Sequence, residues 1–310
     1  MHEVNPVKKL GSDKFVPRVE QMLTGFGKDD PAVASKMPVE ADVPEFLSDR
    51  SRISGSSELS KAVGDLALIG FYYLLRVGEY TVKRSRNETK QTKQFKLEDC
   101  TFFKKNEKGQ LRQLARNAHD DKIMTADSAT LKLDNSKNGW KGVCVNQGTN
   151  GEEHNCAVRA LGRRYISIRR QSPGVKTFLS VYWAEGKRCD VNDEDMRTNL
   201  KWAAVELHYP AKKGIPEDLV DTHSLRIGGA NALSLSGYSD REIQKMGRWR
   251  GQTFKDYVRE QIASFSEGMA KNMKRKFNFV NVCAGAHSGL VDITNTMVVS
   301  PYDNPQAAAA

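Results

Sequence analysis

The segment from Glu58 to Leu75 constrains the fold more than any other part of this chain. Its apolar residues recur at intervals of three and four, and near its C-terminal end they cover most of the circumference of a helix. Ser57 stands just before it and can cap its first turn. We therefore predict a long, centrally buried helix that is ended by Gly78 and carries Arg76 in its last turn.

The region after this helix carries the pattern of a small antiparallel sheet. Apolar residues predict one strand over 95–103, and two further runs, 131–133 and 143–145, alternate apolar with polar side chains. Between these two runs stands Asn138-Gly139, a pair that favours the tight turn of a β-hairpin. We therefore expect a hairpin with its tip at that pair.

Helices are predicted for most of the remaining chain. They cover Ala157–Arg170, Asp193–Leu207, His223–Ser236, a short segment opened by the capping box Ser239–Glu242, a segment from Thr253, and Ser266–Lys276. The order of one helix, a small sheet and then many helices is typical of an α+β fold. We expect residues 1–55 to be a largely irregular linker, 56–280 a single domain and 281–310 a tail.

The chain is basic, with 48 lysines and arginines against 38 acidic residues and a net charge of +10. An excess of positive charge favours polyanionic partners such as nucleic acid. The basic residues are clustered, and Lys104, Lys105, Arg248 and Arg250 are the candidates for contacts with a phosphate backbone. Charge alone remains a weak indication of the partner.

Several classes of protein are disfavoured by composition. No apolar run approaches the roughly 20 residues that a membrane span needs, and the N-terminus lacks an apolar signal region. We therefore expect a soluble intracellular protein, nuclear in a eukaryote and cytoplasmic in a bacterium or phage. The 5 cysteines and 6 histidines show no spacing typical of metal ligands. We expect reduced thiols, no metal and no cofactor.

Five side chains in separate parts of the chain would form a phosphodiester site if folding brought them together. They are Arg76 in LLRVGEY, Lys137 in NSKNGWKG, His223 and Arg226 in THSLRIGG, and Tyr257 in GRWRGQTFKDYVRE. Planar guanidinium groups suit a phosphate whose negative charge grows during displacement, and a phenol can attack it. A general acid would protonate the departing oxygen. Cationic side chains could supply the whole electrostatic field at the phosphate, so no metal is required.

The order and context of these motifs resemble the catalytic domain of tyrosine recombinases, the phage-integrase family, including its eukaryotic transposon-like members. Arg76 and Glu79 match the family's L-R-x-x-E box, and His223-Ser-Leu-Arg226 matches its H-x-x-R box. The resemblance covers about residues 19–279. It implies strand cleavage and rejoining of double-stranded DNA through a 3′-phosphotyrosyl intermediate on Tyr257, without ATP or metal. Recombination or integration of a mobile element would follow.

The resemblance also assigns supporting roles. It implies that Glu79 orients Arg76 and that a hairpin lysine reaches into the DNA groove and protonates the leaving oxygen. Lys137 is our first choice for that lysine, and Lys141 is not excluded. It further implies that subunits assemble on DNA as a homo-oligomer through the last helix, near Ser266–Lys276.

One position departs from the family pattern. The family has Gly-His or Gly-Trp before the tyrosine, whereas this chain has Gly247-Arg248-Trp249. Counting back from Tyr257 puts Arg248 in the usual histidine position, and chemical type puts Trp249 there. The assignment between them stays open, and we favour Trp249 as a packing and hydrogen-bonding support.

Each motif also has an ordinary structural explanation. Arg76 could stabilise a helix terminus with Glu79 as a surface ion pair, and Lys137 could be a solvated turn lysine. His223 could be a satisfied structural histidine, and Tyr257 could border the apolar face of a helix. The five motifs in the family's order, each in suitable secondary structure, favour the functional interpretation.

Three functions remain open at the level of sequence. Family members normally clamp DNA between this domain and an N-terminal core-binding domain, and only about 55 residues precede the first helix here, so we expect half of the clamp to be absent. The first function is that of a recombinase or integrase. The second is that of a domesticated or degenerate relative that binds DNA without cutting it. The third, less favoured, is that of a type IB-like topoisomerase.

Overall fold

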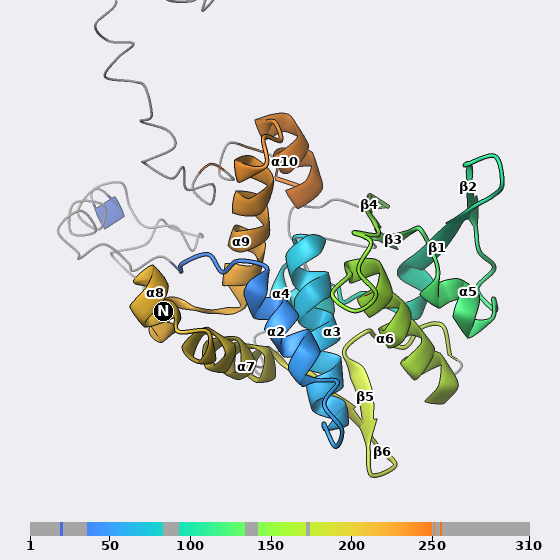
Figure 1. Ribbon diagram of the computed structural model, residues 1–310, viewed down its shortest axis with the longest axis horizontal. Coiled ribbons are helices and arrows are strands. Elements are labelled where there is room, and N and C mark those ends of the chain that lie inside the picture. Colours follow the sequence, from blue (N-terminus) through green and yellow to red (C-terminus); the bar gives the residue numbers. More distant parts are fainter. Residues whose placement is uncertain are drawn as a thin grey trace, which may run out of the picture. The chain divides into compact units, whose positions relative to one another are not determined.

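The computed structural model describes residues 19–20, 36–82, 93–133, 142–171, 174–249, 251 and 255 (Figure 1). Within these ranges helices accompany a four-stranded and a two-stranded antiparallel sheet, which confirms the α+β class. The elements are α2 (Asp42–Arg50), α3 (Glu58–Tyr72), α4 (Val77–Tyr80), η1 (Leu97–Asp99), β1 (Cys100–Lys105), β2 (Leu111–Gln113), α5 (Asp120–Met124), β3 (Ser128–Lys132), β4 (Cys144–Gly148), α6 (Ala157–Gln171), β5 (Val181–Ala184), β6 (Lys187–Asp190), α7 (Asp193–Glu206), α8 (Tyr209–Lys213), η2 (Glu217–Leu219), α9 (Thr222–Leu235) and α10 (Asp240–Gly247). None of the helices in these ranges has both the length and the apolar character needed to cross a membrane.

Helix α3 forms the centre of the core, as its sequence predicts. Every residue from Ala62 to Phe71 is buried. The helix contacts α2, α6 and α9, and Figure 1 shows α2 and α6 along its two sides. Ser57 accepts a hydrogen bond from the Ser60 N–H, so the predicted N-terminal cap is present.

The C-terminal end of this helix differs from the prediction. The last helical residue is Tyr72, and Leu74 adopts the left-handed region with φ of 49°. This conformation turns the chain out of the helix, because a right-handed helix requires negative φ. Arg76 is therefore the extended N-cap of α4, and Gly78 lies inside α4 instead of ending α3.

Part of the segment 1–55, which we expected to be largely irregular, is helical. Residues 42–50 form helix α2, which packs on α3 and buries Val43 and Leu47. Pro44 lies in the first turn of this helix, where a missing N–H costs nothing. The division of the chain into domains stays a prediction.

The four-stranded sheet has the order β2-β1-β3-β4 and contains the predicted hairpin. Leu131 pairs with Val145 in β3 and β4, and the Leu133 N–H donates to the Val143 carbonyl at 2.8 Å. These pairs are symmetric in sequence about Asn138. The pairing agrees with the predicted register, while the turn at 134–141 lies outside the described residues. The strand predicted over 95–103 is shorter, because η1 occupies residues 97–99.

The predicted helices of the C-terminal half that the structure describes are present. Helices α6, α7, α9 and α10 begin and end within two residues of their predicted bounds or caps, and Ser239 and Glu242 form the predicted capping box. The β5–β6 hairpin and α8 were not predicted. The helices predicted from Thr253 and over Ser266–Lys276 lie outside the described residues.

Candidate functional site

The candidate site lies at the junction between α3 and α4. Arg76 is the N-cap of α4, and its backbone N–H donates to Glu79 Oε2 at 2.9 Å. Arg76 Nη1 lies 3.6 Å from Glu79 Oε1, and the Arg76 side chain remains 21% exposed. The carboxylate therefore holds both the backbone and the guanidinium of Arg76, while part of that side chain faces solvent.

The side chain of Arg226, a residue of α9, reaches the same α3–α4 junction. Its side chain is almost completely buried, and its two terminal nitrogens donate to the carbonyl oxygens of Leu74 and Gly247. Two glycines of α9 allow this approach, because a Cβ at Gly229 would lie 2.5 Å from the Phe71 carbonyl and a Cβ at Gly228 would overlap the chain at Val39. The small residues of this helix thus serve close packing against α3.

His223 lies one turn before Arg226 on the same face of α9, at a half-buried position. Burial lowers the pKa of its imidazole, and the positive charges of Arg226 and Arg76 lower it further, against an opposing effect of Asp221. His223 is thus within electrostatic reach of both arginines. The lowered pKa favours the neutral imidazole near neutral pH.

Arg248 is a buried member of the same cluster. It follows α10 in the left-handed region with φ of 59°, and its Nη2 donates to Glu79 Oε2 at 2.9 Å and to the Leu74 carbonyl at 3.1 Å. The side chains of Arg248 and Glu79 are each 1% exposed. At this burial the Arg248 guanidinium presents almost no surface to a phosphate backbone, and its expected contact with DNA stays an untested prediction. Burial lowers the pKa of Arg248, and Glu79 opposes that effect.

Trp249 covers the Arg226 guanidinium. The central carbon of that group lies 4.4 Å from the centroid of the indole, and Trp249 itself is 6% exposed. Gly247 leaves room for the ring, since a Cβ there would lie 1.6 Å from the indole Cζ3. Trp249 thus holds Arg226 from one face, as a packing support would.

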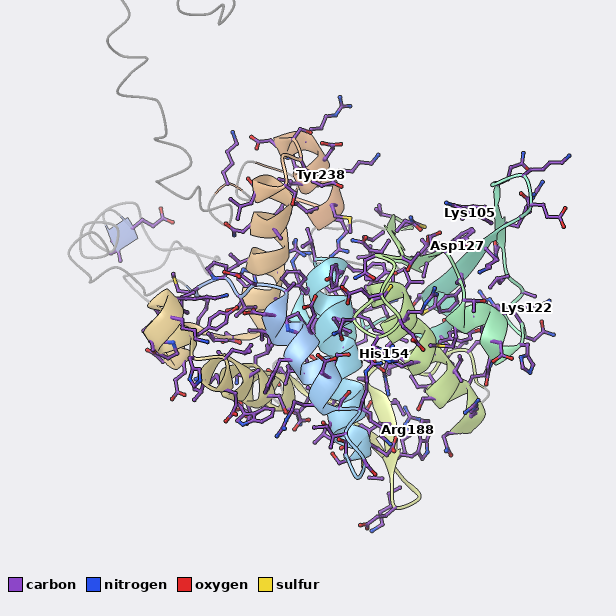
Figure 2. All side chains as sticks on the ribbon, viewed as in Figure 1. Lys105, Lys122, Asp127, His154, Arg188 and Tyr238 are labelled. Atoms are coloured by element: carbon purple, nitrogen blue, oxygen red, sulfur yellow. The ribbon has the colours of Figure 1, made fainter. Side chains whose placement is uncertain are left out.

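Two of the predicted DNA contacts lie on β1 and differ in their surroundings. Lys105 is exposed, and Figure 2 shows it near the end of β1 where the chain turns toward β2. The Lys104 ammonium donates to the Thr125 carbonyl and lies 3.9 Å from Asp127 Oδ2. Lys104 is therefore already engaged within the protein, and Lys105 is the better placed of the two for a phosphate.

The structure brings six of the predicted site residues together: Arg76, Glu79, His223, Arg226, Arg248 and Trp249. Lys137, Lys141, Arg250 and Tyr257 lie outside the described residues. Sequence reasoning missed two carbonyl oxygens: that of Leu74, which accepts from both Arg226 and Arg248, and that of Gly247, which accepts from Arg226. Backbone acceptors carry no signal of their own in a sequence.

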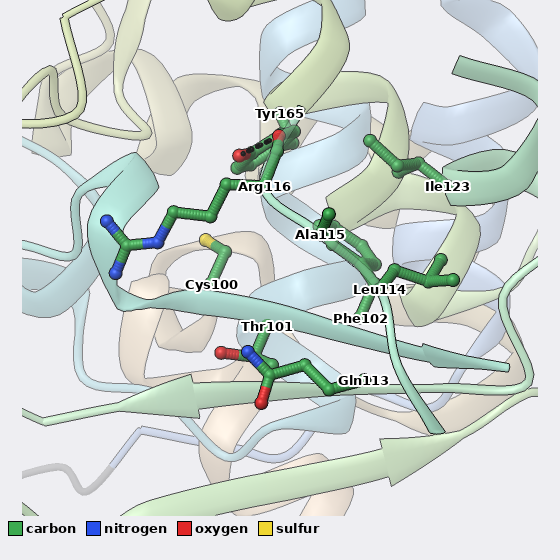
Figure 3. A pocket seen from close by; sticks show the side chains of 9 residues that line it. All are labelled: Cys100, Thr101, Phe102, Gln113, Leu114, Ala115, Arg116, Ile123 and Tyr165. Carbon is green, nitrogen blue, oxygen red and sulfur yellow. Dashed lines mark hydrogen bonds between the residues drawn. The ribbon is translucent and has the colours of Figure 1, made fainter. Parts of the chain in front are cut away.

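A hollow elsewhere in the described part of the chain is lined by residues of β1, β2, α5 and α6 and of the segment after β2, and it contains none of these side chains (Figure 3). The Tyr165 hydroxyl donates to the Arg116 carbonyl at its edge, at 3.0 Å. Burial raises the pKa of the Cys100 thiol that lines it, which disfavours a reactive thiolate. We therefore place the candidate site at the α3–α4 junction and not here.

No protein-family model and no curated protein matches the chain. Among solved structures it is similar to the Tn1549 transposon integrase in complex with transposon right end DNA, with a TM-score of 0.41 and 12% identity over 79% of this chain and 69% of that chain. It is also similar to XerA recombinase, with a TM-score of 0.43 and 14% identity over 80% of this chain and 67% of that chain.

Proposed function

We propose that this chain cleaves and rejoins strands of double-stranded DNA through a covalent 3′-phosphotyrosyl intermediate on Tyr257, as a recombinase or integrase. The observation that carries this proposal is the convergence of Arg76, His223 and Arg226 at the α3–α4 junction. These residues stand far apart in the sequence, and they are the ones that the H-x-x-R and L-R-x-x-E boxes select. A chance match of motifs gives no reason for them to meet.

The charge of the cluster fits a phosphodiester. The guanidiniums of Arg76, Arg226 and Arg248 carry three positive charges and the Glu79 carboxylate one negative charge, which leaves two positive charges. A phosphodiester has one negative charge and gains about one more in its pentacoordinate state. The cluster would therefore favour the transition state over the ground state, which is the condition for catalysis.

The proposed reaction balances without a further reactant. The Tyr257 phenol would give its proton to the neutral imidazole of His223 while its oxygen bonds to phosphorus. The bond from phosphorus to the 5′ oxygen would break, and Lys137 would protonate that oxygen. Rejoining is the reverse, with a 5′ hydroxyl as the nucleophile. The parts given to Tyr257 and Lys137 come from the motif resemblance.

A nicked suicide substrate tests the proposal, because loss of the short strand beyond the cleavage point traps the covalent adduct. We expect an adduct on a denaturing gel with the wild-type chain and none with Tyr257→Phe. Tyr238→Phe is the matched control, since Tyr238 is 52% exposed on the turn between α9 and α10 (Figure 2). A gel-mobility shift without any adduct would contradict the proposed chemistry.

One observation favours the second candidate, a degenerate relative that binds DNA without cutting it. Arg226 is 1% exposed, and both of its terminal nitrogens donate to backbone carbonyls. A phosphate would have to reach its remaining N–H groups or displace a carbonyl. The adduct experiment separates the two candidates, because only the first forms a covalent bond. Assembly through Ser266–Lys276 would be tested by the size of the DNA complex.

A further inference from the structure

We propose that Arg248 is a positioning residue that acts on Arg76 through Glu79 and on Arg226 through the Leu74 carbonyl, and that it does so without touching DNA. This role rests on the proposed function. The sequence left open whether Arg248 or Trp249 fills the position that the family gives to histidine or tryptophan. This proposal gives that position to Arg248.

The first support is the way in which Arg248 joins two elements. It lies at the C-terminal cap of α10 in the left-handed region, a conformation in which glycine is the usual residue. From there its Nη2 reaches both Glu79 in α4 and the carbonyl of Leu74, which precedes α4. One guanidinium thus ties the end of α10 to the segment that carries Arg76.

The second support is the sharing of a single carboxylate. Glu79 Oε2 accepts from the Arg76 N–H and from Arg248 Nη2, and Glu79 Oε1 faces Arg76 Nη1 at 3.6 Å. Without Arg248, a carboxylate that is 1% exposed would have Arg76 as its principal counter-charge. Arg76 would then be drawn toward Glu79 and away from a phosphate. With Arg248 present, the charge of Arg76 remains available to the substrate.

The third support is the carbonyl of Leu74, which is shared by two arginines. It accepts from Arg226 Nη1 and from Arg248 Nη2. Leu74 is itself in the left-handed region, a conformation that persists where surrounding contacts support it, and these two donors are such contacts. Arg248 thus helps to fix the acceptor that aligns Arg226. Lysine could not replace it, because a single ammonium lacks the planar fork of donors.

A set of variants separates positioning from a merely structural ion pair. Cleavage is measured in a single turnover at saturating nicked DNA, together with Kd for DNA and unfolding in urea. For Arg248→Met we expect a rate about 100-fold lower with Kd unchanged within about threefold, since misplaced catalytic groups cost about that much. Arg241→Met is the control, because Arg241 is exposed on the same helix, and its rate should equal the wild-type rate.

The double variant Glu79→Gln with Arg248→Met gives the decisive comparison. Removing both partners of a buried pair restores much of the stability that removing one partner loses. We expect that recovery of stability without recovery of the cleavage rate, because Arg76 still lacks its orientation. Recovery of both would overturn the positioning role. A higher Kd with an unchanged saturating rate would also overturn it, since that result indicates a DNA contact.

Two further measurements cover the remaining outcomes. If Arg248→Met does not fold, Arg248→Lys keeps the charge and is expected to fold with a similarly reduced rate, whereas a wild-type rate would overturn the proposal. If the wild-type chain forms no adduct, the proposed function fails, and the NMR signal of the Arg76 Nε–H group still tests the coupling. That signal should shift in Arg248→Met and not in Arg241→Met. No shift in either variant would overturn the inference.

Discussion

The guanidinium of Arg226 lies over the indole of Trp249, with 4.4 Å between its central carbon and the ring centroid. Both residues are buried, and the same guanidinium donates to the carbonyls of Leu74 and Gly247. A desolvated contact between a cation and an aromatic ring contributes about 2 kcal/mol. The ring and the two carbonyls together hold Arg226 in one orientation, which the proposed contact with a phosphate would require.

Gly247 controls this arrangement, and its substitution gives a direct test. A Cβ at position 247 would lie 1.6 Å from the Trp249 Cζ3, so Gly247→Ala must displace the indole from Arg226. We expect the free energy of unfolding to fall by about 1–3 kcal/mol, as overpacking usually does. The adduct yield should fall with it. Urea unfolding followed by tryptophan fluorescence measures the first effect.

Gly251→Ala is the control for that experiment, because a Cβ at Gly251 would have no atom of the described residues within 4 Å. We expect it to change the free energy of unfolding by less than about 0.5 kcal/mol, as exposed substitutions do. Equal stability of the two variants would show that the indole does not occupy the place described here.

Two buried tyrosines differ in one hydrogen bond. Tyr73 and Tyr80 are each 0% exposed. The Tyr73 hydroxyl donates to the Ala129 carbonyl at 3.0 Å, whereas the Tyr80 hydroxyl has no hydrogen-bond partner among the described residues. Tyr73→Phe should lower the free energy of unfolding by about 1–2 kcal/mol, and Tyr80→Phe should leave it unchanged or raise it by about 1 kcal/mol. Urea denaturation of both variants measures the contrast, and the opposite ranking would contradict it.

The parts of the fold that local pattern determines were predictable. The buried face of α3, the register of the β3–β4 hairpin and the capping box before α10 each depend on residues close in sequence. The β5–β6 hairpin also has a local signal in the sequence, namely Gly186, because glycine is typical of two-residue turns. In the structure Glu185 and Gly186 both have positive φ, as such a turn requires. Its prediction was within reach of the sequence.

The interior of the site was not predictable in the same way. The H-x-x-R spacing places His223 and Arg226 on one face of a helix, which sequence can show. The pairing of Arg248 with Glu79 spans 169 positions, and nothing near Arg248 indicates that it is buried. The carbonyl of Leu74, a residue in the left-handed region, likewise accepts from Arg226 in α9 and from Arg248 after α10, both of which are distant in sequence. Tertiary contacts, and not local propensity, decide these features.

The titration of His223 tests the electrostatics of the cluster. Burial is the largest cause that lowers its pKa, Arg226 and Arg76 lower it further, and Asp221 raises it. NMR titration of the imidazole should therefore give a pKa below the value of about 6.5 that an unperturbed histidine has. We expect Arg76→Gln to raise the pKa and Asp221→Asn to lower it. Shifts in the reverse directions would show that these groups do not act on His223.

The same lowered pKa predicts how stability depends on pH. The unfolded chain binds the His223 proton more tightly than the folded chain does, so acid favours unfolding. This contribution to stability is complete above the unfolded pKa of about 6.5 and is lost as the pH falls below it toward the folded pKa. His223→Gln should make the free energy of unfolding less dependent on pH in that window. Urea unfolding at a series of pH values measures the difference.

Neighbouring lysines on β1 provide a test of the proposed DNA contacts. Lys105 is exposed, whereas the Lys104 ammonium donates to the Thr125 carbonyl and lies 3.9 Å from Asp127. Each phosphate contact releases counterions, so Lys105→Ala should reduce the slope of log K against log salt concentration by about one. Lys104→Ala should change it less, because its charge is already partly balanced within the protein. Filter binding across salt concentrations measures both slopes, and an equal loss in the two variants would mean that DNA draws Lys104 away from Asp127.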